Sequence, residues 1–391
     1  MYLTREEEKV LDGEYGEGQR LAMKILCALG DFFEAERLIS VQSAHVSGVS
    51  YKTGGDALIS TLEKFAGSGA KTSILTTLNP GGVDLERWRD LRVDENFLEK
   101  QKKIISLYAE MGVLPTCSCT PYEVGNIPAE GVHVAFAESS AVTLVNSYFK
   151  AKTNRESGIS ALASAVTGKT PLYGLHLDEN RHPTVKVSVH APLKSPTHYG
   201  VLGYLLGKTL KNSIPLIQSR HTLSLTAAKQ LSAAIAASGA VSLYYWERDH
   251  IKSPTIEETV EIDDHQLNEV FNSFSLTDKP DLIVLGCPHY SIYELKMVSE
   301  MLNGKVSKRL SFWVFTSRQV KLLGERMGFV QKIEKAGGKV LCDTCPIVAP
   351  LKGFKTMLTD SVKAAHYAPS MNKVSSALLP IEECVKTALE A

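Results

Sequence analysis

Apolar residues follow two patterns along this chain, and the two patterns alternate. Short apolar runs of strand length are followed by segments in which apolar residues recur every three or four positions, the spacing of a helix with one buried face. The runs predict strands at 37–44, 73–77, 133–137, 185–189, 214–218, 281–287, 312–315 and 339–342, and another that ends near Cys119. Strands that alternate with helices are typical of parallel sheets. We therefore expect an α/β fold built from several mostly parallel sheets.

Helix signals fill the segments between these strands. Thr4 and Glu7 have the spacing of a capping box, which predicts a short first helix. Segment 249–268 is acidic and lacks apolar periodicity, so we expect an exposed excursion or an inter-domain segment there. The blocks of alternating elements predict three subdomains, at 1–180, 181–280 and 281–391. Further helices are predicted at 19–33, 56–65, 98–111, 140–149, 200–210, 227–237, 292–302 and 318–335, and in a C-terminal segment around Cys384.

The charges of the chain balance. Its 391 residues include 43 Lys and Arg and 43 Asp and Glu, so no overall field attracts nucleic acid or an anionic membrane. No apolar run reaches the roughly 18 residues of a membrane span, and the N-terminus is acidic where a signal peptide is basic. We expect a cytoplasmic protein that binds neither nucleic acid nor membrane, with any anion site built locally. Its seven cysteines, an odd number, do not resemble a disulfide framework.

Three cysteines stand in polar or proline-marked turns after apolar runs, namely Cys119, Cys287 and Cys345. Ligands collect at the ends of strands in α/β proteins, and three thiolates could hold an iron–sulfur cluster. A 4Fe–4S cluster with three cysteine ligands leaves one iron open to a substrate hydroxyl and carboxylate, which indicates a hydro-lyase. Taken singly, each cysteine is more often a small buried hydrophobe.

Neighbouring cysteines leave a second metal hypothesis open. Cys117 precedes Cys119 by two residues and Cys342 precedes Cys345 by three, so these four thiolates could form a structural zinc site. Cys-x-x-Cys is common in zinc sites, whereas Cys-x-Cys lies outside the usual spacing. The remaining two cysteines lie in predicted helices and are expected in the core; they are Cys27 and Cys384.

Small polar turns at strand ends are the candidates for binding an anion. They supply backbone N–H groups, a hydroxyl and an amide, which suit a carboxylate or a phosphate, although the same residue types dominate ordinary turns. The residues in these turns are Gly48, Val49, Ser50, Asn79 and Pro80.

Three further residues are candidates for substrate contact. Glu138 and Ser139 begin a predicted helix, where they serve either as an N-cap or as ligands of a substrate hydroxyl or an iron. Lys363 is the cation best placed to meet an anionic substrate, although a helix lysine is usually solvated. His45 and His289 stand beside candidate turns, and such histidines are more often hydrogen-bonded structural residues than catalysts. The sequence holds no complete P-loop, dinucleotide-binding or nucleophile-elbow motif.

A set of motifs, in order over essentially the whole chain, resembles the aconitase X family. The motifs are SAHVSGVSY at 43–51, TLNPG at 77–81, CTPY at 119–122, ESSAV at 138–142, NS at 146–147, TNRESG at 153–158, GCPH at 286–289, DTCP at 343–346 and KAAHYAP at 363–369. The set is far more specific than any one motif. The resemblance implies an aconitase-like α/β large subunit with its subdomains around a central cleft.

The resemblance also implies an activity. Archaeal family members with a separate large subunit of this length dehydrate mevalonate 5-phosphate to an anhydromevalonate phosphate in the mevalonate pathway, and some longer members dehydrate cis-3-hydroxyproline. The implied partner in a heterodimer is a small swivelling-domain subunit, whose serine acts as the base in the family. The implied cluster ligands are Cys119, Cys287 and Cys345, whereas Cys117 and Cys342 are not part of the family pattern. The implied substrate contacts are Gly48, Val49, Ser50, Asn79, Pro80, Glu138, Ser139 and Lys363.

Overall fold

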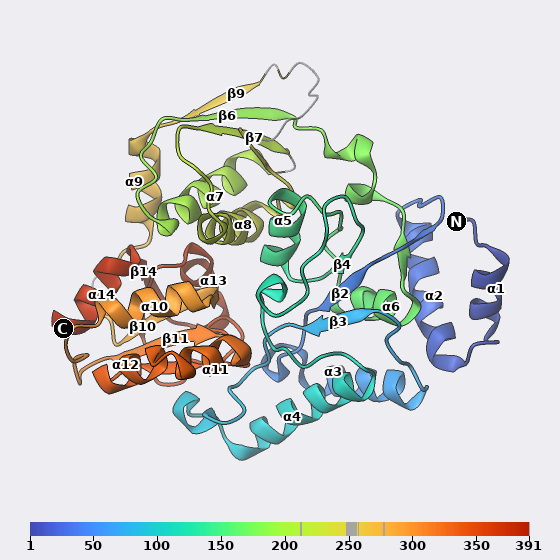
Figure 1. Cartoon of the computed structure of the whole chain (residues 1–391), viewed down its shortest axis with the longest axis horizontal. Helices are drawn as coiled ribbons and strands as arrows, with labels where there is room; N and C mark the ends of the chain where they lie inside the picture. Colours follow the sequence, from blue (N-terminus) through green and yellow to red (C-terminus); the bar gives the residue numbers. More distant parts are fainter. Residues whose placement is uncertain (212, 248–255, 257, 277, 391) are drawn as a thin grey trace. The chain divides into compact units, whose positions relative to one another are not determined.

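The chain forms two compact units (Figure 1). The computed structural model describes residues 1–211, 213–247, 256, 258–276 and 278–390. The first unit consists of Met1–Gly82 and Asp94–His182, and the second of Val83–Val93 and Pro183–Ala391. The short segment Val83–Val93 therefore belongs to the second unit, although the residues before and after it belong to the first.

The first unit contains a three-stranded parallel sheet with the order β3-β2-β4. Its strands are β2 (Ser43–Val46), β3 (Leu75–Leu78) and β4 (Ala135–Phe136). The middle strand β2 is buried at every residue, as expected for a strand with two neighbours in a covered parallel sheet. A separate antiparallel pair joins β1 (Leu38–Ser40) to β5 (Lys169–Pro171).

Helices pack around the strands of the first unit (Figure 1). The helices α3 and α4 contact each other along their lengths, and α6 packs on both α2 and β2. The α-helices are α1 (Arg5–Asp12), α2 (Glu17–Phe32), α3 (Tyr51–Gly67), α4 (Glu95–Glu110), α5 (Ser139–Ser147) and α6 (Gly158–Thr167). Single-turn 3-10 helices are η2 (Pro121–Glu123), η3 (Gly174–His176) and η4 (Asp178–Arg181), and η1 (Trp88–Leu91) lies in the segment that joins the second unit.

The second unit contains a four-stranded parallel sheet with the order β8-β7-β6-β9. Buried and partly exposed residues alternate along β6 and β7, so one face of this sheet is covered and the other is not fully covered. The strands are β6 (Val185–Val189), β7 (Pro215–Ser219), β8 (Tyr245–Trp246) and β9 (Thr259–Ile262). The associated helices are α7 (Pro196–Leu210), α8 (Leu225–Gly239) and α9 (Asp264–Ser273).

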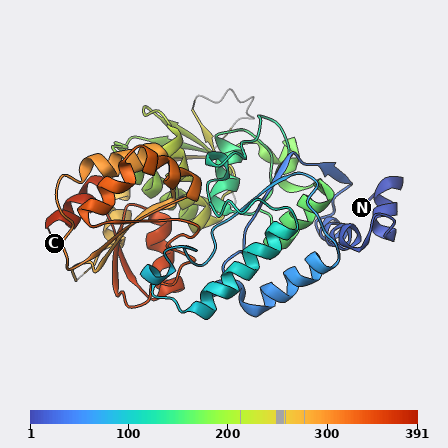
Figure 2. The ribbon, with the colours of Figure 1, turned by 60° about the horizontal axis from the view of Figure 1, so that its bottom comes forward.

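A five-stranded parallel sheet with the order β12-β11-β10-β13-β14 completes the second unit. Its strands are β10 (Leu282–Tyr290), β11 (Ser311–Thr316), β12 (Lys339–Leu341), β13 (Thr356–Thr359) and β14 (Ser375–Leu378). The helices are α10 (Ile292–Met301), α11 (Arg318–Arg326), α12 (Phe329–Ala336), α13 (Val362–Asn372) and α14 (Ile381–Glu390). One core cluster joins α10, α12 and α14 to the sheet, while α13 packs toward α7 and α8 (Figure 2).

The strand order of this sheet creates a switch point. The chain moves from β10 through β11 to β12 on one side, and then crosses to β13 and β14 on the other. Ligands of α/β proteins bind outside the carboxyl ends of the strands at such a point. Here the switch point lies between β10 and β13. Cys287 lies just after the regularly paired part of β10, and Lys363 lies in α13, which follows β13.

The predicted α/β class is confirmed, and several elements agree closely. The strand predicted at 185–189 is β6, and the capping box of Thr4 and Glu7 starts α1. Both parts of the box are present, because Glu7 N donates to Thr4 Oγ1 and Thr4 N donates to the Glu7 carboxylate. Within the described residues, no helix combines the length and apolar character needed to cross a bilayer.

Two of the predicted strands were wrong. The run 37–44 is divided between β1 and β2, which belong to different sheets. Residues 115–119, all described, form no strand before Cys119, and the neighbouring Leu114 makes only an isolated bridge to Thr77. No strand forms because Pro115 has no N–H to donate. The hydroxyl of Thr116, and not its backbone, bonds both N and O of Leu78.

Other corrections concern the second unit. The helix predicted at 318–335 is two helices, α11 and α12, because Gly328 adopts a left-handed φ of 77° between them. Of the predicted excursion at 249–268, residues 249–255 and 257 lie outside the described residues, but the rest contains β9 and the start of α9. Here Asp263 and Gln266 form a capping box that outweighs the polar composition. The strands β13 and β14 were missed altogether.

The contact between α7 and α8 yields a first prediction. A Cβ on Gly203 would lie 2.5 Å from the carbonyl oxygen of Leu231, so α8 would have to move. We expect Gly203→Ala to lower the free energy of unfolding by about 1–3 kcal/mol, as overpacking does. The matched control is Gly67→Ala at the end of α3, where a Cβ meets nothing within 4 Å and helix propensity favours alanine. Denaturant unfolding measures both, and equal stability of the two variants would contradict the packing argument.

Candidate functional site

The seven predicted substrate residues of the first unit lie at one edge of its parallel sheet. All seven come one to four residues after the end of a strand: Gly48, Val49 and Ser50 after β2, Asn79 and Pro80 after β3, and Glu138 and Ser139 after β4. Parallel neighbouring strands end at the same edge, so the structure brings all three turns together. Their setting is recessed, because Val49 and Ser50 are 1% exposed and Asn79 and Ser139 are 8% exposed.

A chain of hydrogen bonds connects the β2, β3 and β4 ends. His45 Nδ1 lies 2.9 Å from Thr77 Oγ1, and His45 Nε2 lies 3.3 Å from Asn79 Oδ1. The Asn79 amide donates to Glu138 Oε2 at 2.9 Å, while Glu138 Oε1 accepts from the Ser140 hydroxyl at 3.0 Å. The chain fixes the Asn79 amide with its nitrogen toward the carboxylate and its oxygen toward the imidazole.

Burial decides the charge of His45. The ring is fully buried, and burial lowers the pKa of His45 to about 4 even though the Glu138 charge opposes this shift. The imidazole is therefore neutral near pH 7. Because Asn79 Oδ1 can only accept, Nε2 donates to it and Nδ1 is left to accept from Thr77. A catalytic base needs a ring nitrogen that the substrate can reach, and both nitrogens of His45 are bonded within the protein. His45 therefore orients Asn79 and is not suited to act as a general base.

Gln101, which was not predicted from the sequence as a site residue, links two of the anion turns. This residue of α4 is completely buried. Its Oε1 accepts from Tyr51 N at 2.9 Å and from Gly82 N at 2.7 Å, and its Nε2 donates to the carbonyl oxygen of Val49 at 3.0 Å. The available signal was a lone glutamine on the apolar face of a predicted helix, which is unfavourable unless its amide is bonded.

The Cys119 turn is anchored beside the Asn79 turn. Ser118 N donates to the carbonyl oxygen of Leu78 at 2.9 Å, and the Thr116 hydroxyl bonds the same oxygen at 3.0 Å. Leu78 is the last residue of β3, so it immediately precedes Asn79. The structure thus brings Cys119, which is 6% exposed, to the edge of the sheet that carries the seven polar residues.

In the second unit, Cys287 follows the paired part of β10. Parallel pairing with β11 is regular up to Leu285 and then shifts before Tyr290. Gly286 has a φ of 94°, and a Cβ there would lie 2.1 Å from the carbonyl oxygen of Phe315. No other residue type fits this close approach. Cys287 itself is 3% exposed.

Cys345 and Lys363 follow the ends of two further strands of the same sheet. Cys345 comes four residues after β12 and is 8% exposed. Lys363 is the second residue of α13, next to the end of β13, and it is also 8% exposed. The expectation of a solvated helix lysine therefore does not hold, and Lys363 belongs to the group of buried polar side chains near the switch point.

Left-handed backbone precedes each of the three predicted cluster cysteines by one or two residues. The residues concerned are Cys117, Gly286 and Asp343, with φ values of 46°, 94° and 63°. The other non-glycine residues with positive φ in the described part of the chain follow the ends of helices; they are Glu34, Arg92, Lys150, Lys211, Ala240 and Lys373. Such conformations cost about 1 kcal/mol or more for non-glycine residues and concentrate where function requires a particular turn.

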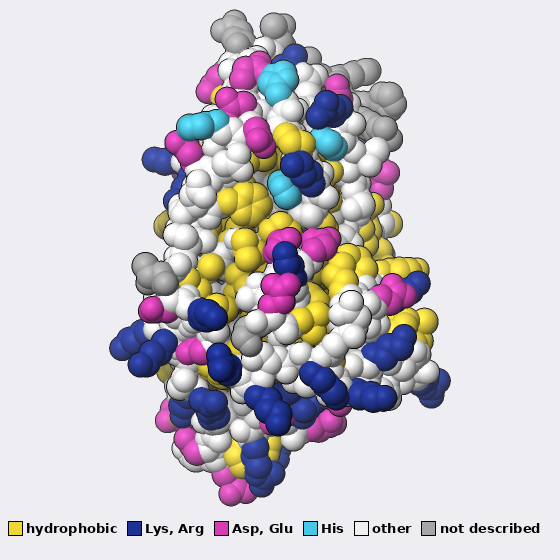
Figure 3. All heavy atoms as spheres, turned by 90° about the vertical axis from the view of Figure 1, so that its left-hand side faces the viewer, with side chains coloured by type: hydrophobic (Ala, Val, Ile, Leu, Met, Phe, Trp, Pro, Cys, Tyr) yellow, Lys and Arg dark blue, Asp and Glu magenta, His cyan; other side chains and the backbone are white. Residues whose placement is uncertain are grey.

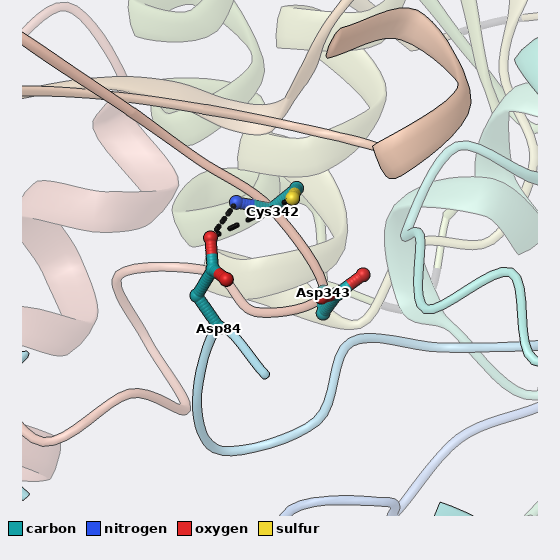
Figure 4. A group of neighbouring side chains, drawn as sticks. All are labelled: Asp84, Cys342 and Asp343. Atoms are coloured by element: carbon teal, nitrogen blue, oxygen red, sulfur yellow. Dashed lines mark hydrogen bonds between the residues drawn. The ribbon is translucent and has the colours of Figure 1, made fainter. Parts of the chain in front are cut away.

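The surroundings of Cys342 differ from those of the three cysteines (Figure 4). Asp84, Cys342 and Asp343 bring their ligand atoms within 4.8 Å of one another. Cys342 N and Sγ both donate to Asp84 Oδ2, at 2.8 Å and 3.5 Å. Burial, and then the charges of Asp343 and Asp84, raise the pKa of the Cys342 thiol far above its usual range. The group is thus a protonated thiol beside two carboxylates.

The guanidinium of Arg318 supplies the positive charge in this group. Its guanidinium contacts Asp84 Oδ1 at 3.3 Å and pairs closely with Asp343 Oδ2. The charges are therefore compensated by a side chain, which argues against Cys342 as a metal thiolate and against the four-cysteine zinc site. The contacts also fasten segment Val83–Val93, which follows the Asn79 turn in the chain, to the residues just before Cys345.

A hollow of about 550 Å³ opens elsewhere on the second unit. Of the described residues that line it, none belongs to the predicted site. Figure 3 looks onto the side that carries α9 and α14 and shows apolar side chains gathered across its middle. The apolar lining of the hollow comes from Phe271, Phe274, Leu276, Leu358, Leu378 and Leu379.

Known proteins resemble this chain over its whole length. It is 45% identical to the phosphomevalonate dehydratase large subunit of Methanocaldococcus jannaschii, covering 99% of this chain and 100% of that one. The cis-3-hydroxy-L-proline dehydratase of Pseudomonas aeruginosa is more distant, with 29% identity over 98% of this chain and 69% of the relative. The crystal structure of Thermococcus kodakaraensis aconitase X in its holo-form superposes with a TM-score of 0.92 at 43% identity, covering 99% and 100% of the two chains.

Sequence models of the aconitase X family account for most of the chain. The first-domain model matches residues 1–179, the second-domain model residues 183–272 and the third-domain model residues 280–390. The relatives named above are dehydratases, which is consistent with the predicted hydro-lyase. From the sheet edges, the motif-bearing turns and these matches together, the chain belongs to the aconitase X family.

Proposed function

We propose that this chain is the large subunit of a phosphomevalonate dehydratase. The support is the similarity over the full length to archaeal chains of that name, at 45% and 44% identity, against 29% for the hydroxyproline dehydratases. The reaction removes a hydroxyl and a neighbouring proton from mevalonate 5-phosphate, which carries both a carboxylate and a phosphate. We also propose three subdomains at 1–180, 181–280 and 281–391, which the three matched stretches support.

We further propose that Cys119, Cys287 and Cys345 hold an iron–sulfur cluster, with 4Fe–4S the type that three ligands suit best. The observation that carries this assignment is the shared local design: each cysteine is buried and is presented by a turn with left-handed backbone. A buried polar atom fits the same group. Thr344 Oγ1, adjacent to Cys345, is buried and meets no hydrogen-bond partner among the described residues, and a hydroxyl can donate to a cluster or thiolate sulfur.

The cluster and the chain's own residues would have separate tasks. When bound, a cluster of this kind supplies an open iron that acts as a Lewis acid on the departing hydroxyl. Glu138 accepts hydrogen bonds on both oxygens in the structure and, as a carboxylate at a strand end, is suited to accept one from a substrate hydroxyl. Asn79, held by His45 and Glu138, presents its amide in a fixed orientation. Fixed polar groups of this kind need no reorganisation when the substrate arrives.

Helix N-termini would bind the anionic ends of the substrate. Glu138 is the N-cap of α5, and Lys363 lies in the first turn of α13. Ser50 precedes the first short turn of α3, which non-helical backbone at Gly55 separates from the rest of that helix. Backbone N–H groups and the helix dipole make such termini favourable for carboxylate and phosphate. Because the chain as a whole carries no net charge, this local design and the Lys363 ammonium would replace long-range attraction.

No convincing base for the proton is found among the candidates in this chain. His45 is buried and oriented toward Asn79, and His289 is fully buried with Nε2 bonded to the carbonyl oxygen of Thr344. The name "large subunit" of the relatives implies a small partner. We therefore propose a heterodimer in which the small subunit supplies the base and closes the site against water.

The cluster assignment predicts the effect of single cysteine substitutions. Cys119→Ser, Cys287→Ser and Cys345→Ser each remove a ligand, so each variant should lose the broad absorption near roughly 400 nm and all turnover. The matched control is Cys342→Ser, in which a hydroxyl can still donate to Asp84. Anaerobic purification with iron and sulfide analysis measures the outcome. Loss of metal from Cys117→Ser and Cys342→Ser, with metal retained in Cys287→Ser, would support a zinc site instead.

The neutral state of His45 predicts a pH dependence of stability. Its pKa is about 4 in the folded state and about 6.5 when unfolded, so as the pH falls through this range the unfolded state binds the proton first. The stabilisation is complete above about pH 6.5 and is lost toward pH 4, by about 3 kcal/mol at most. His45→Gln should flatten this part of the pH profile of the unfolding free energy.

The control for this experiment is His265→Gln on α9, because the His265 side chain is 78% exposed. Denaturant unfolding at a series of pH values should give the control the same acid slope as the wild type. An unchanged slope in His45→Gln would mean that His45 is protonated in the folded protein.

The proposed partnership predicts that turnover requires both subunits. The reconstituted chain alone should not dehydrate mevalonate 5-phosphate, and addition of its small subunit should start the reaction, because only then is a base present. The assay uses cis-3-hydroxyproline as the control substrate, which should not react. Comparable turnover with and without the small subunit would place the base in this chain, and turnover of hydroxyproline alone would replace the proposed substrate.

A further inference from the structure

A buried lysine of α8 reaches the Cys287 turn from outside the five-stranded sheet. Lys229 is only 1% exposed. Its Nζ donates to the carbonyl oxygen of His289 at 2.8 Å and to Glu294 Oε2 at 2.8 Å. Lysine is seldom buried, and removing two charges from water costs more than a surface pair gains, so general stability does not account for this pair.

The lysine and its partner hold two points of the same turn. Glu294 Oε2 accepts from Ser291 N at 2.8 Å and from the Ser291 hydroxyl at 2.7 Å. Together with the bond from Lys229 to His289, this fixes the backbone at residues 289 and 291, which lie two and four residues after Cys287. The carbonyl oxygen between them, that of Tyr290, accepts from the Thr316 hydroxyl at 2.5 Å.

The residue that Lys229 holds is in contact with the second cysteine turn. His289 Nε2 lies 2.8 Å from the carbonyl oxygen of Thr344, and since a carbonyl only accepts, the ring nitrogen donates. Thr344 immediately precedes Cys345. A continuous set of hydrogen bonds therefore runs from Lys229 through His289 to the Cys345 turn, entirely within the second unit.

We propose that Lys229 is a positioning residue that sets the spacing between the Cys287 and Cys345 turns by fixing His289. The proposal rests on the proposed function, because it assigns Lys229 a task toward two ligands of the proposed cluster. Substituting a group that orients metal ligands without touching the metal commonly lowers metal affinity by about 10–100-fold. The task of Lys229 is thus geometric: it holds the carbonyl of the residue whose ring fixes the neighbour of Cys345.

A simpler role would be to neutralise Glu294, and two variants separate the roles. Lys229→Met removes the bond to His289 and leaves the Glu294 charge buried without its lysine. The double variant Lys229→Met with Glu294→Gln removes that charge as well, while the glutamine oxygen can still accept from Ser291. The matched control is Lys169→Met, which breaks the partly buried ion pair of Lys169 with Glu7 between β5 and α1 of the first unit.

The test applies three measurements to the full-length chain and its variants. The first is the rate at which an alkylating reagent modifies Cys287 before iron is added, followed by peptide mass spectrometry. The second is the rate at which a chelator removes iron after anaerobic reconstitution. The third is the thermal unfolding midpoint. Cys384, a completely buried residue of α14, serves as the internal reference for alkylation.

We expect Lys229→Met to speed both Cys287 alkylation and iron loss by about tenfold or more. The double variant should recover the unfolding midpoint but keep both fast rates, and Lys169→Met should leave both rates at the wild-type value. If the double variant restores the rates together with the midpoint, Lys229 only neutralises Glu294 and the proposal is overturned. If the wild type binds no iron, the proposed cluster fails, and the alkylation rates still decide whether Lys229 positions the turn.

Discussion

The course of β10 around Gly286 is the constraint on which the second unit depends. This strand is buried at all of its residues and is paired in parallel on both sides up to Val284, and its pairing with β11 is interrupted between Leu285 and Tyr290. Gly286 lies in this interruption with left-handed backbone, and the carbonyl of Phe315 occupies the space that any side chain would need. Cys287 therefore emerges at a position fixed by backbone packing, at the switch point where α/β proteins bind ligands.

In the first unit, side-chain hydrogen bonds fix the turns that follow the strands. Three parallel strands end there at one edge of the sheet, and polar side chains form the hydrogen bonds beyond the strand ends. Gln101 and the chain of His45, Asn79 and Glu138 satisfy the turns with side-chain hydrogen bonds. Because this network is buried, its members are held in one orientation. His45 Nε2, for example, donates to the Asn79 oxygen and thereby leaves the Asn79 nitrogen directed at Glu138, while neutral His45 accepts from Thr77 at Nδ1.

A few charged side chains lie beside the turns of the second unit. The chain has no net charge, yet it places ion pairs beside the turns: Lys229 with Glu294 is buried, and Arg318 with Asp343 is partly buried. Arg318 compensates the charge of the two carboxylates next to Cys342, whose ligand atoms lie close enough together for a metal ion.

Much of the fold and part of the site could be predicted from the sequence. Strands such as β6 and β10 were recognisable because alternation or continuous apolar character identifies them, and the turn residues followed from their positions after strands. The Cys119 turn could not be predicted, because the Thr116 hydroxyl replaces backbone pairing there. The hydrogen-bond partners of Gln101, Lys229 and Arg318 were also not predictable. Each acts on residues distant in sequence, and only the three-dimensional packing brings the partners together.

We propose that three cysteines hold a cluster with one iron open to the substrate. Mössbauer spectroscopy of the anaerobic chain, reconstituted with isotopically enriched iron and mixed with its small subunit, tests this most directly. We expect one iron subsite that is distinct from the others and whose signal changes when mevalonate 5-phosphate is added, while cis-3-hydroxyproline leaves it unchanged. A cluster whose irons are all equivalent and unaffected by the substrate, or a protein that binds zinc and no iron, would contradict it.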